Sequence, residues 1–261
     1  MSGVTMRKRQ KLVLVTVLLT AGLAVTDWIN FEFRYIWVGV FTVVTWLMSA
    51  WSLKEGMNGI EWLTILIPGT LFFAGSGLFL MLLPDKWVVK SIFVLLCGIA
   101  EYFLLLTANI FSVAKIRTIA LFRAALAVSF VMTVVTAFFI FNTILSFRQP
   151  FWAIGLFVVL GSALLLLPAL WAVELKPVLD QRVIRYTWFL ALYIGFFGVA
   201  ISFWPISTAV ASIFMATVMY VFLGLSQHHF SGRLFPKTVW EYVPFGLVVL
   251  ITMLLTAGRG V

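Results

Sequence analysis

Long apolar segments, separated by short clusters of charged and turn-forming residues, follow one another along the whole chain. A helix needs about 20 mostly apolar residues to cross the hydrocarbon core of a bilayer, and a continuously apolar run favours a helix over a barrel strand, whose residues alternate. The pattern predicts an all-α polytopic membrane protein, a bundle of about nine transmembrane helices in one domain covering residues 1–261. The predicted spans are 12–28, 35–53, 62–83, 91–113, 118–147, 151–173, 186–204, 206–225 and 243–257.

Three of these spans need a further argument. Residues 186–225 contain almost no polar interruption, and we divide them at Pro205, because the residue before a proline is disfavoured in a helix. One half of that region could instead be a re-entrant segment. The last span has only 15 residues and is expected to be partly interfacial. The first follows a basic cluster, as a signal peptide would, but we interpret it as a true helix.

Composition agrees with a membrane protein. Hydrophobic residues make up 63% of the chain and charged residues 10%, which excludes an ordinary soluble domain and a disordered chain. The single cysteine, Cys97, excludes an intramolecular disulfide and a multi-thiolate metal site. Because all predicted loops are short, no separate soluble catalytic or binding domain is expected.

The net charge of +9 is better explained by topology than by nucleic-acid binding, since the basic residues lie between apolar runs. With the N-terminus in the cytoplasm, the larger share of Lys and Arg falls on the cytoplasmic side, as the positive-inside rule requires. The cytoplasmic set is Arg7, Lys8, Arg9, Lys11, Lys54, Lys115, Arg117, Lys176, Arg182, Arg185, Arg233 and Lys237; the opposite set is Arg34, Lys86, Lys90, Arg148 and Arg259. We therefore expect a cytoplasmic N-terminus in a plasma (cytoplasmic) membrane. The expected partners are membrane lipids and other membrane subunits or a second copy of the chain, not nucleic acid.

Tryptophan gathers near the predicted helix ends. The amphipathic indole prefers the interface between lipid and water, so this distribution predicts an aromatic belt rather than a ligand-binding cage. The residues are Trp28, Trp37, Trp51, Trp62, Trp87, Trp152, Trp171, Trp188, Trp204 and Trp240.

One acidic residue, Glu101, lies near the centre of the fourth predicted span. Helical spacing places Lys90, Cys97, Ala108 and Ser112 on its face. Ionisable residues at membrane depth are costly and are functional candidates by default. Glu101 is thus a candidate proton-coupling or cation-coordinating carboxylate. The alternative is a structural role, in which a protonated or hydrogen-bonded Glu101 joins neighbouring helices.

Polar neighbours extend this candidate into a substrate or ion path. A tight link at 114–117 makes the fourth and fifth spans an antiparallel hairpin, in which residue 131 is level with Glu101. The predicted path comprises Glu101, Tyr102, Asn109, Ser129 and Thr133.

A second ionisable residue inside a span is Arg123. The same hairpin places it level with Asn109, to which it could donate while its stem extends towards the interface. The expected role is helix anchoring. An anionic lipid-headgroup site formed by Lys115, Arg117 and Arg123 is the alternative.

Hydroxyl stripes and helix breakers also mark several spans. The stripes are Thr42, Thr45, Ser49 and Ser52 in the second span and Ser129, Thr133, Thr136 and Thr143 in the fifth; such stripes favour close helix packing over a hydrated path. The third span contains Pro68-Gly69. Broken helices form ion sites in transporters, although glycine also serves packing and no internal repeat is evident.

No catalytic, metal or cofactor site is predicted. The chain lacks an HExxH sequence, a GxSxG nucleophile and a P-loop. The two histidines, His228 and His229, are adjacent in a predicted loop without other ligands. Two functions remain: a small-solute or ion transporter that uses Glu101, and a non-catalytic membrane scaffold or complex subunit in which polar residues serve packing. An enzyme acting on lipid comes third, for lack of an acid–base pair.

Overall fold

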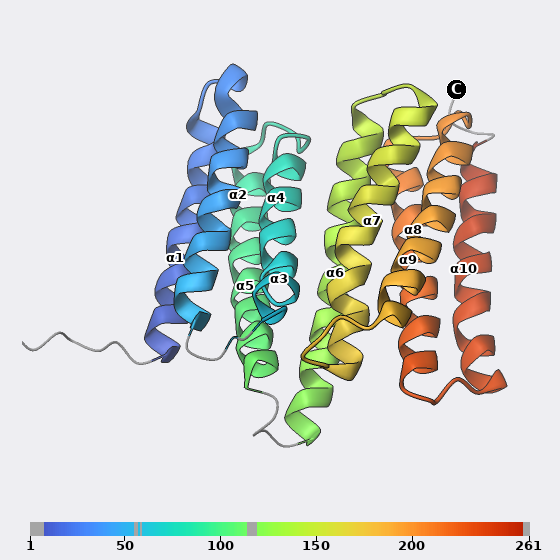
Figure 1. Ribbon diagram of the computed structural model, residues 1–261. Helices are drawn as coiled ribbons and strands as arrows, with labels where there is room; N and C mark the ends of the chain where they lie inside the picture. Colours follow the sequence, from blue (N-terminus) through green and yellow to red (C-terminus); the bar gives the residue numbers. More distant parts are fainter. Residues whose placement is uncertain (1–7, 55–56, 58, 114–118, 258–261) are drawn as a thin grey trace, which may run out of the picture. The chain divides into compact units, whose positions relative to one another are not determined.

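The computed structural model describes residues 8–54, 57, 59–113 and 119–257 (Figure 1). Within these ranges every regular element is a helix, and nine helices are long and apolar enough to cross a membrane. The predicted all-α, nine-span membrane fold is confirmed for this part of the chain. The cytoplasmic position of the N-terminus stays a prediction.

The chain forms two compact units, residues 1–129 and 130–261. In the first unit α1 packs against α2 and α5, and α4 packs against α2 and α5. The core of this unit is apolar, with Leu19, Phe72 and Leu105 fully buried. Its helices are α1 Lys8–Val25, the 3-10 turn η1 Thr26–Trp28, α2 Phe31–Leu53, α3 Glu61–Thr64, α4 Ile67–Leu80 and α5 Trp87–Ser112, followed by the start of α6 Ile119–Ser146.

In the second unit α7 packs against α8 and α9, and α9 also packs against α8 and α10. The side-chain amide of Asn142 on α6 donates to the Ser212 hydroxyl on α9 at 3.0 Å. The bounds are α7 Phe151–Glu174, α8 Gln181–Ser202, α9 Thr208–Phe230 and α10 Pro236–Ala257.

Glycine allows α7 and α8 to approach closely. A Cβ built on Gly195 of α8 would lie 3.3 Å from the carbonyl oxygen of Gly155 on α7 and would collide with the Val159 side chain. A Cβ on Gly198 would lie 3.1 Å from Val158. Small residues at a helix–helix interface bring backbones together in this way, so Gly195 and Gly198 serve the packing of α8 on α7.

The division at Pro205 is confirmed. α8 ends at Ser202 and α9 begins at Thr208, and with 22 and 23 residues each helix is long enough to cross a bilayer by itself. No re-entrant segment is needed.

Two of the helix boundaries predicted from the sequence near the C-terminus are wrong. α9 does not end at Leu225 but continues to Phe230, so His228 and His229 lie in its last turn rather than in a loop. α10 begins at Pro236 and has 22 residues, so the short length that suggested a partly interfacial segment is also wrong. Proline suits the first turn of a helix, where its missing N–H has no intrahelical partner.

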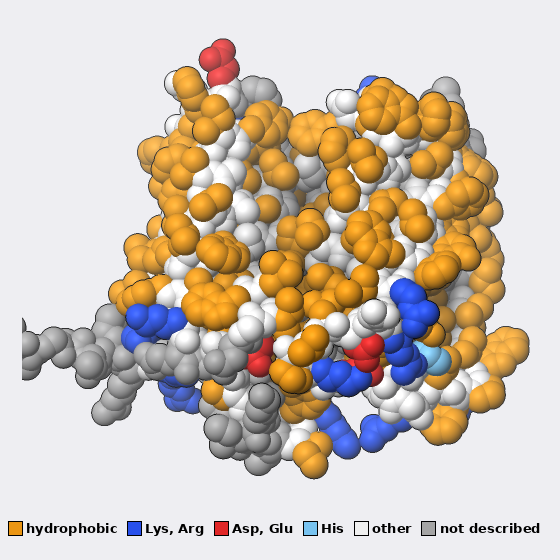
Figure 2. Space-filling view, in the orientation of Figure 1, with side chains coloured by type: hydrophobic (Ala, Val, Ile, Leu, Met, Phe, Trp, Pro, Cys, Tyr) orange, Lys and Arg blue, Asp and Glu red, His pale blue; other side chains and the backbone are white. Residues whose placement is uncertain are grey.

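Figure 2 shows hydrophobic side chains over most of the visible helix flanks, with Lys and Arg gathered near helix ends. Tryptophan follows the expected interfacial pattern at several ends: Trp28, Trp87 and Trp240 are 89%, 79% and 76% exposed. Trp171 is an exception, because it is buried and its indole N–H donates to the Lys176 carbonyl at 2.9 Å. That bond closes the C-terminal turn of α7, where Leu175 adopts a left-handed conformation.

Candidate functional site

Glu101 is buried in the core of the first unit, on α5. Its side chain is 3% exposed, and neither carboxyl oxygen has a hydrogen-bond partner among the described residues. The predicted face of α5 is confirmed, since Lys90, Cys97 and Ala108 are buried with it. A buried polar group without a partner is unusual and costly in folded proteins, so this carboxyl calls for a functional explanation.

The carboxyl lies against the start of α4. A Cβ built on Gly69 would lie 3.1 Å from Oε1 of Glu101, so glycine leaves the space that the carboxyl occupies. The interruption between α3 and α4 falls at Ile65–Leu66, before Pro68 rather than at it, because proline is accommodated in the first turn of α4. The structure therefore brings together the predicted broken third span and the predicted carboxylate.

A small cavity adjoins Glu101. The volume open to the centre of a water-sized sphere is about 10 Å³, close to the minimum for one water molecule. Its polar groups come from Thr20, Ser76, Cys97 and Glu101, and Leu and Phe side chains supply much of the remaining lining. The Ser76 hydroxyl donates to the Phe73 carbonyl at 3.1 Å, so its proton is already used. The space beside Glu101 is thus too small for more than one water molecule.

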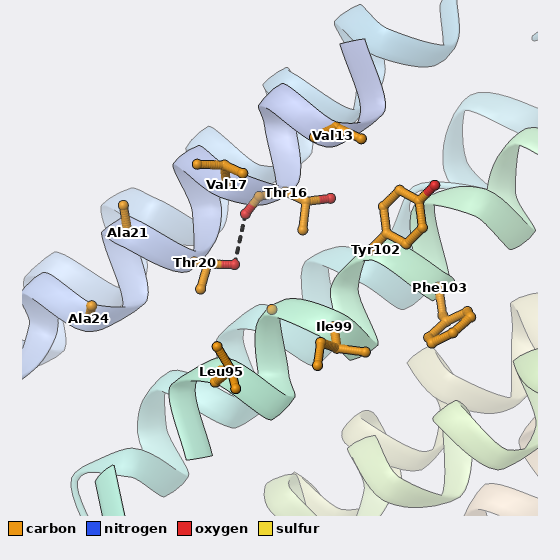
Figure 3. Close-up of a pocket in the computed structure, with 11 residues that line it drawn as sticks. Val13, Thr16, Val17, Thr20, Ala21, Ala24, Leu95, Ile99, Tyr102 and Phe103 are labelled. Carbon is orange, nitrogen blue, oxygen red and sulfur yellow. Dashed lines mark hydrogen bonds between the residues drawn. The ribbon is translucent and has the colours of Figure 1, made fainter. Parts of the chain in front are cut away.

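A much larger groove runs between α1 and α5 (Figure 3). Its volume is about 560 Å³, and its lining is almost wholly apolar. Val13 and Tyr102 lie at one end, and Ala24 and Leu95 at the other. The lining includes the exposed side chains Val13, Val17, Leu95, Ile99 and Phe103. The groove therefore opens sideways, onto what is bilayer hydrocarbon in a membrane.

Two residues line both the groove and the cavity: Thr20 of α1 and Gly98 of α5. A Cβ on Gly98 would collide with the Thr20 side chain, so the two residues are in direct contact. The Thr20 hydroxyl donates to the Thr16 carbonyl of its own helix at 2.8 Å (Figure 3). Thr20 and Gly98 thus form a boundary shared by the groove and the Glu101 cavity.

A charged cluster closes the other end of this α5 face. The Lys90 ammonium, on a residue only 6% exposed, donates to Asp27 at 2.5 Å and to Asp85 at 2.6 Å. Arg34 donates to the Asp27 carbonyl at 2.9 Å. Hydrogen bonding and the charge of Lys90 lower the pKa of the exposed Asp85 carboxyl below its usual range. The cluster ties the α1–α2 turn to the start of α5, and Lys90 and Asp27, 63 residues apart, are too distant in sequence to be paired by inspection.

The other residues of the predicted path have different surroundings. Tyr102 lines the groove rather than the Glu101 cavity, and Asn109 is half-buried on α5. Ser129 and Thr133 are buried on α6. Their predicted position beside Glu101, and hence the path itself, stays a prediction.

The predicted anchoring group is described only in part. Lys115 and Arg117 lie outside the described residues. Arg123 is exposed on α6, and it makes no hydrogen bond to Asn109 within the described ranges. Neither the anchoring role nor the headgroup site is tested by this arrangement.

Three residues of the hydroxyl stripe on α2 are buried, Thr45, Ser49 and Ser52, each at most 3% exposed, whereas Thr42 is half-buried. Thr45 donates to the Phe41 carbonyl at 2.8 Å, and Ser52 to the Ser49 carbonyl at 2.9 Å. Those two hydroxyls bond to their own helix backbone and do not need a water-filled path, but the Ser49 hydroxyl has no hydrogen-bond partner among the described residues.

Sequence reasoning missed a cluster in the second unit. Nε2 of His229 lies 2.9 Å from a guanidinium nitrogen of Arg182 and 3.0 Å from the Tyr186 hydroxyl. The Arg182 guanidinium also lies over the Phe230 ring, 4.7 Å from its centroid. The cluster joins the start of α8 to the end of α9. No signal in the sequence indicated it, because the histidines were predicted to lie in a loop rather than in the last turn of α9.

The α7–α8 turn carries a solvated ion network. Lys176 pairs with Glu174 at 2.8 Å and with Asp180 at 2.9 Å, and both contacts raise the pKa of its ammonium. Asp180 caps α8 by accepting from the Arg182 backbone N–H at 2.9 Å, and this bond, with Lys176, lowers the pKa of its carboxyl. Lys176 is exposed, whereas the side chains of Glu174 and Asp180 are only 18% and 35% exposed. The three groups stabilise the turn.

Within the described ranges no three His, Cys, Asp or Glu side chains approach one another as metal ligands do. No protein family model, no curated protein and no solved structure matches this chain. Function is therefore inferred from the geometry around Glu101.

Proposed function

We propose that this multi-pass membrane protein transports a small solute or ion and that Glu101 is its binding carboxyl. The observation that carries the proposal is the burial of Glu101 with both carboxyl oxygens unpartnered. An ionisable group at membrane depth is costly. A bound proton or cation would use the hydrogen-bonding capacity that the described residues leave unused.

The competing scaffold function explains Glu101 less well. A carboxyl that joins helices must donate to or accept from a neighbouring helix, and no described residue is such a partner. The scaffold function is favoured by a different observation, the close glycine packing of α7 on α8. That packing assigns a structural role to the second unit and leaves Glu101 unexplained.

The small size of the cavity indicates which conformational state of the proposed transporter the structure represents. About 10 Å³ beside Glu101 admits at most one water molecule, so the arrangement corresponds to an occluded state. The interruption between α3 and α4, next to Gly69, is the natural place for the backbone to move. Helix interruptions of this kind adjoin the binding sites of secondary transporters.

The proposal includes a plasma (cytoplasmic) membrane location and a cytoplasmic N-terminus, both supported by the bias of Lys and Arg. Lipids are the expected neighbours, with a second copy or another membrane subunit as a further partner. Cys97 is the only cysteine, so Cys97→Ser provides a thiol-free background. A cysteine placed at Lys54 should then react with an impermeant maleimide only from the cytoplasmic side, and one placed at Lys86 only from the opposite side.

Carbodiimide labelling in intact membranes tests the role of Glu101, since these reagents react with protonated carboxyls. We expect modification of Glu101 that decreases as pH rises and is absent in Glu101→Gln. Glu32, an exposed carboxyl in the first turn of α2, serves as the internal control for reagent activity. Labelling of Glu32 without labelling of Glu101 at any pH would show a sealed residue and support the scaffold function.

A further inference from the structure

We propose that the ligand of Glu101 is a lipophilic cation that enters sideways from the bilayer through the groove between α1 and α5. This inference rests on the proposed function and adds to it the substrate class and the route of entry. It starts from the position of Thr20 and Gly98, which line both the groove and the Glu101 cavity.

The boundary shared by the groove and the cavity includes the Thr20 side chain, which is held by its own helix. The Thr20 hydroxyl bonds to the Thr16 carbonyl within α1, not to α5. Gly98 contributes no side chain, and a Cβ there would collide with Thr20. Rotation of the Thr20 side chain would therefore widen the connection between groove and cavity without breaking a hydrogen bond between α1 and α5.

Charge complementarity selects a cation. Glu101 has no cationic partner among the described residues, and the buried cation on the same face, Lys90, is already paired with Asp27 and Asp85. An anionic ligand would face an unneutralised carboxyl at low dielectric, which is strongly unfavourable.

The lining of the groove favours a cation that carries a large apolar group. Its lining is nearly all hydrocarbon, with hydroxyls only from Thr16, Thr20 and Tyr102. The two threonine hydroxyls donate to carbonyls of their own helix. A hydrated inorganic ion would lose its water there without replacement. A ligand with a single positive charge on a large apolar body would place that body in the groove and its charge beside Glu101.

Two carbodiimides of different solubility test the route. In proteoliposomes at one pH, membrane-soluble dicyclohexylcarbodiimide should label Glu101 about tenfold faster than a cationic, water-soluble carbodiimide, which enters hydrocarbon poorly. Tetraphenylphosphonium should protect Glu101 from the membrane-soluble reagent, whereas tetramethylammonium, which lacks the apolar body, should not.

A groove-filling variant sharpens the test. Ala21→Leu adds bulk at an exposed position that lines the groove but not the cavity, and it should slow labelling by the membrane-soluble reagent. Gly39→Leu is the matched control, because Gly39 is exposed on α2 with nothing within 4 Å of an added Cβ. Its labelling should equal that of the parent protein.

Each outcome separates the two proposals. Equal or faster labelling by the water-soluble reagent, or labelling that Ala21→Leu does not slow, would overturn lateral entry and leave transport through Glu101 standing. Protection by tetramethylammonium as strong as by tetraphenylphosphonium would overturn the apolar substrate class. Failure of both reagents to label Glu101, with the exposed Glu32 labelled normally, would overturn the proposed function itself.

Discussion

The two units of the chain differ in the kind of polar side chain that they bury. In the first unit, ionisable side chains are buried: Lys90 with two carboxylate partners and Glu101 with none. In the second, the described buried polar residues are neutral, such as Asn142 paired with Ser212. Its charged clusters lie at helix ends. Ionisable groups at membrane depth cost stability and are candidates for function, so the comparison supports the role proposed for Glu101 in the first unit and a packing role for the polar residues of the second.

The largest expected effect concerns packing in the second unit. Gly195→Leu would force a side chain against Val159 and the Gly155 backbone, and we expect it to destabilise the protein by about 3 kcal/mol. Gly39→Leu, on an open surface of α2, should not destabilise the protein, because nothing lies within 4 Å of an added Cβ and leucine has the higher helix propensity. Thermal unfolding in detergent, followed by tryptophan fluorescence, measures both. Equal effects of the two substitutions would contradict the assignment of close packing to α7 and α8.

The second prediction concerns substitutions that remove ion pairs from the charged cluster of the first unit. Lys90→Met leaves Asp27 and Asp85 without their shared cation and should cost about 2 kcal/mol, as for hydrogen bonds to charged groups. Asp85→Asn should cost less, because the Asp85 side chain is 97% exposed. The same unfolding measurement ranks them, and an Asp85→Asn protein less stable than Lys90→Met would refute this order.

A third prediction has the opposite sign. Glu101→Met removes a buried, unpartnered carboxyl, and replacing such a group by an apolar one of similar size should stabilise the protein by about 1 kcal/mol. The variant should also lose all carbodiimide labelling at position 101. A marked loss of stability would instead reveal that Glu101 holds the helices together, as the scaffold function requires.

The smallest effect is a pH dependence in the second unit. The pKa of Asp180 is lowered in the folded protein, chiefly by the Arg182 backbone N–H and then by Lys176. Its contribution to stability is therefore complete above the ordinary aspartate pKa and is lost as pH falls through the lowered value. Asp180→Asn keeps a side chain that can cap the helix but removes the charge. Melting temperatures of parent and variant should thus differ slightly at neutral pH and converge in acid.

Hydrophobic pattern was sufficient to predict most of the fold, because each span must satisfy its own backbone hydrogen bonds in lipid. Pro205 marked a helix boundary because the residue before a proline is disfavoured in a helix, which is also a local effect. The pattern misplaced the ends of α9 and the start of α10, where polar residues such as His228 and Glu241 continue a helix beyond its apolar part.

The site was predictable only in outline. A carboxyl at membrane depth identified Glu101, and helical spacing identified its buried face. The contact with Gly69, the boundary formed by Thr20 and Gly98, and the pairing of Lys90 with Asp27, 63 residues away, depend on how α1, α4 and α5 pack. Tertiary packing of this kind leaves no local signal in the chain.

Two of the predicted spans differ in length, so the thickness of the bilayer affects them differently. The third span, Glu61–Leu80, has 20 residues and α6 has 28, which at 1.5 Å per residue is about 30 Å and about 42 Å, against a hydrocarbon core of about 30 Å. The third span therefore matches the core only with α3 and α4 both inside it, whereas a helix as long as α6 is accommodated by tilting. Gly69, whose missing side chain leaves room for Glu101, lies in the first turn of α4. A thicker bilayer would thus stretch the third span first, at the interruption between α3 and α4.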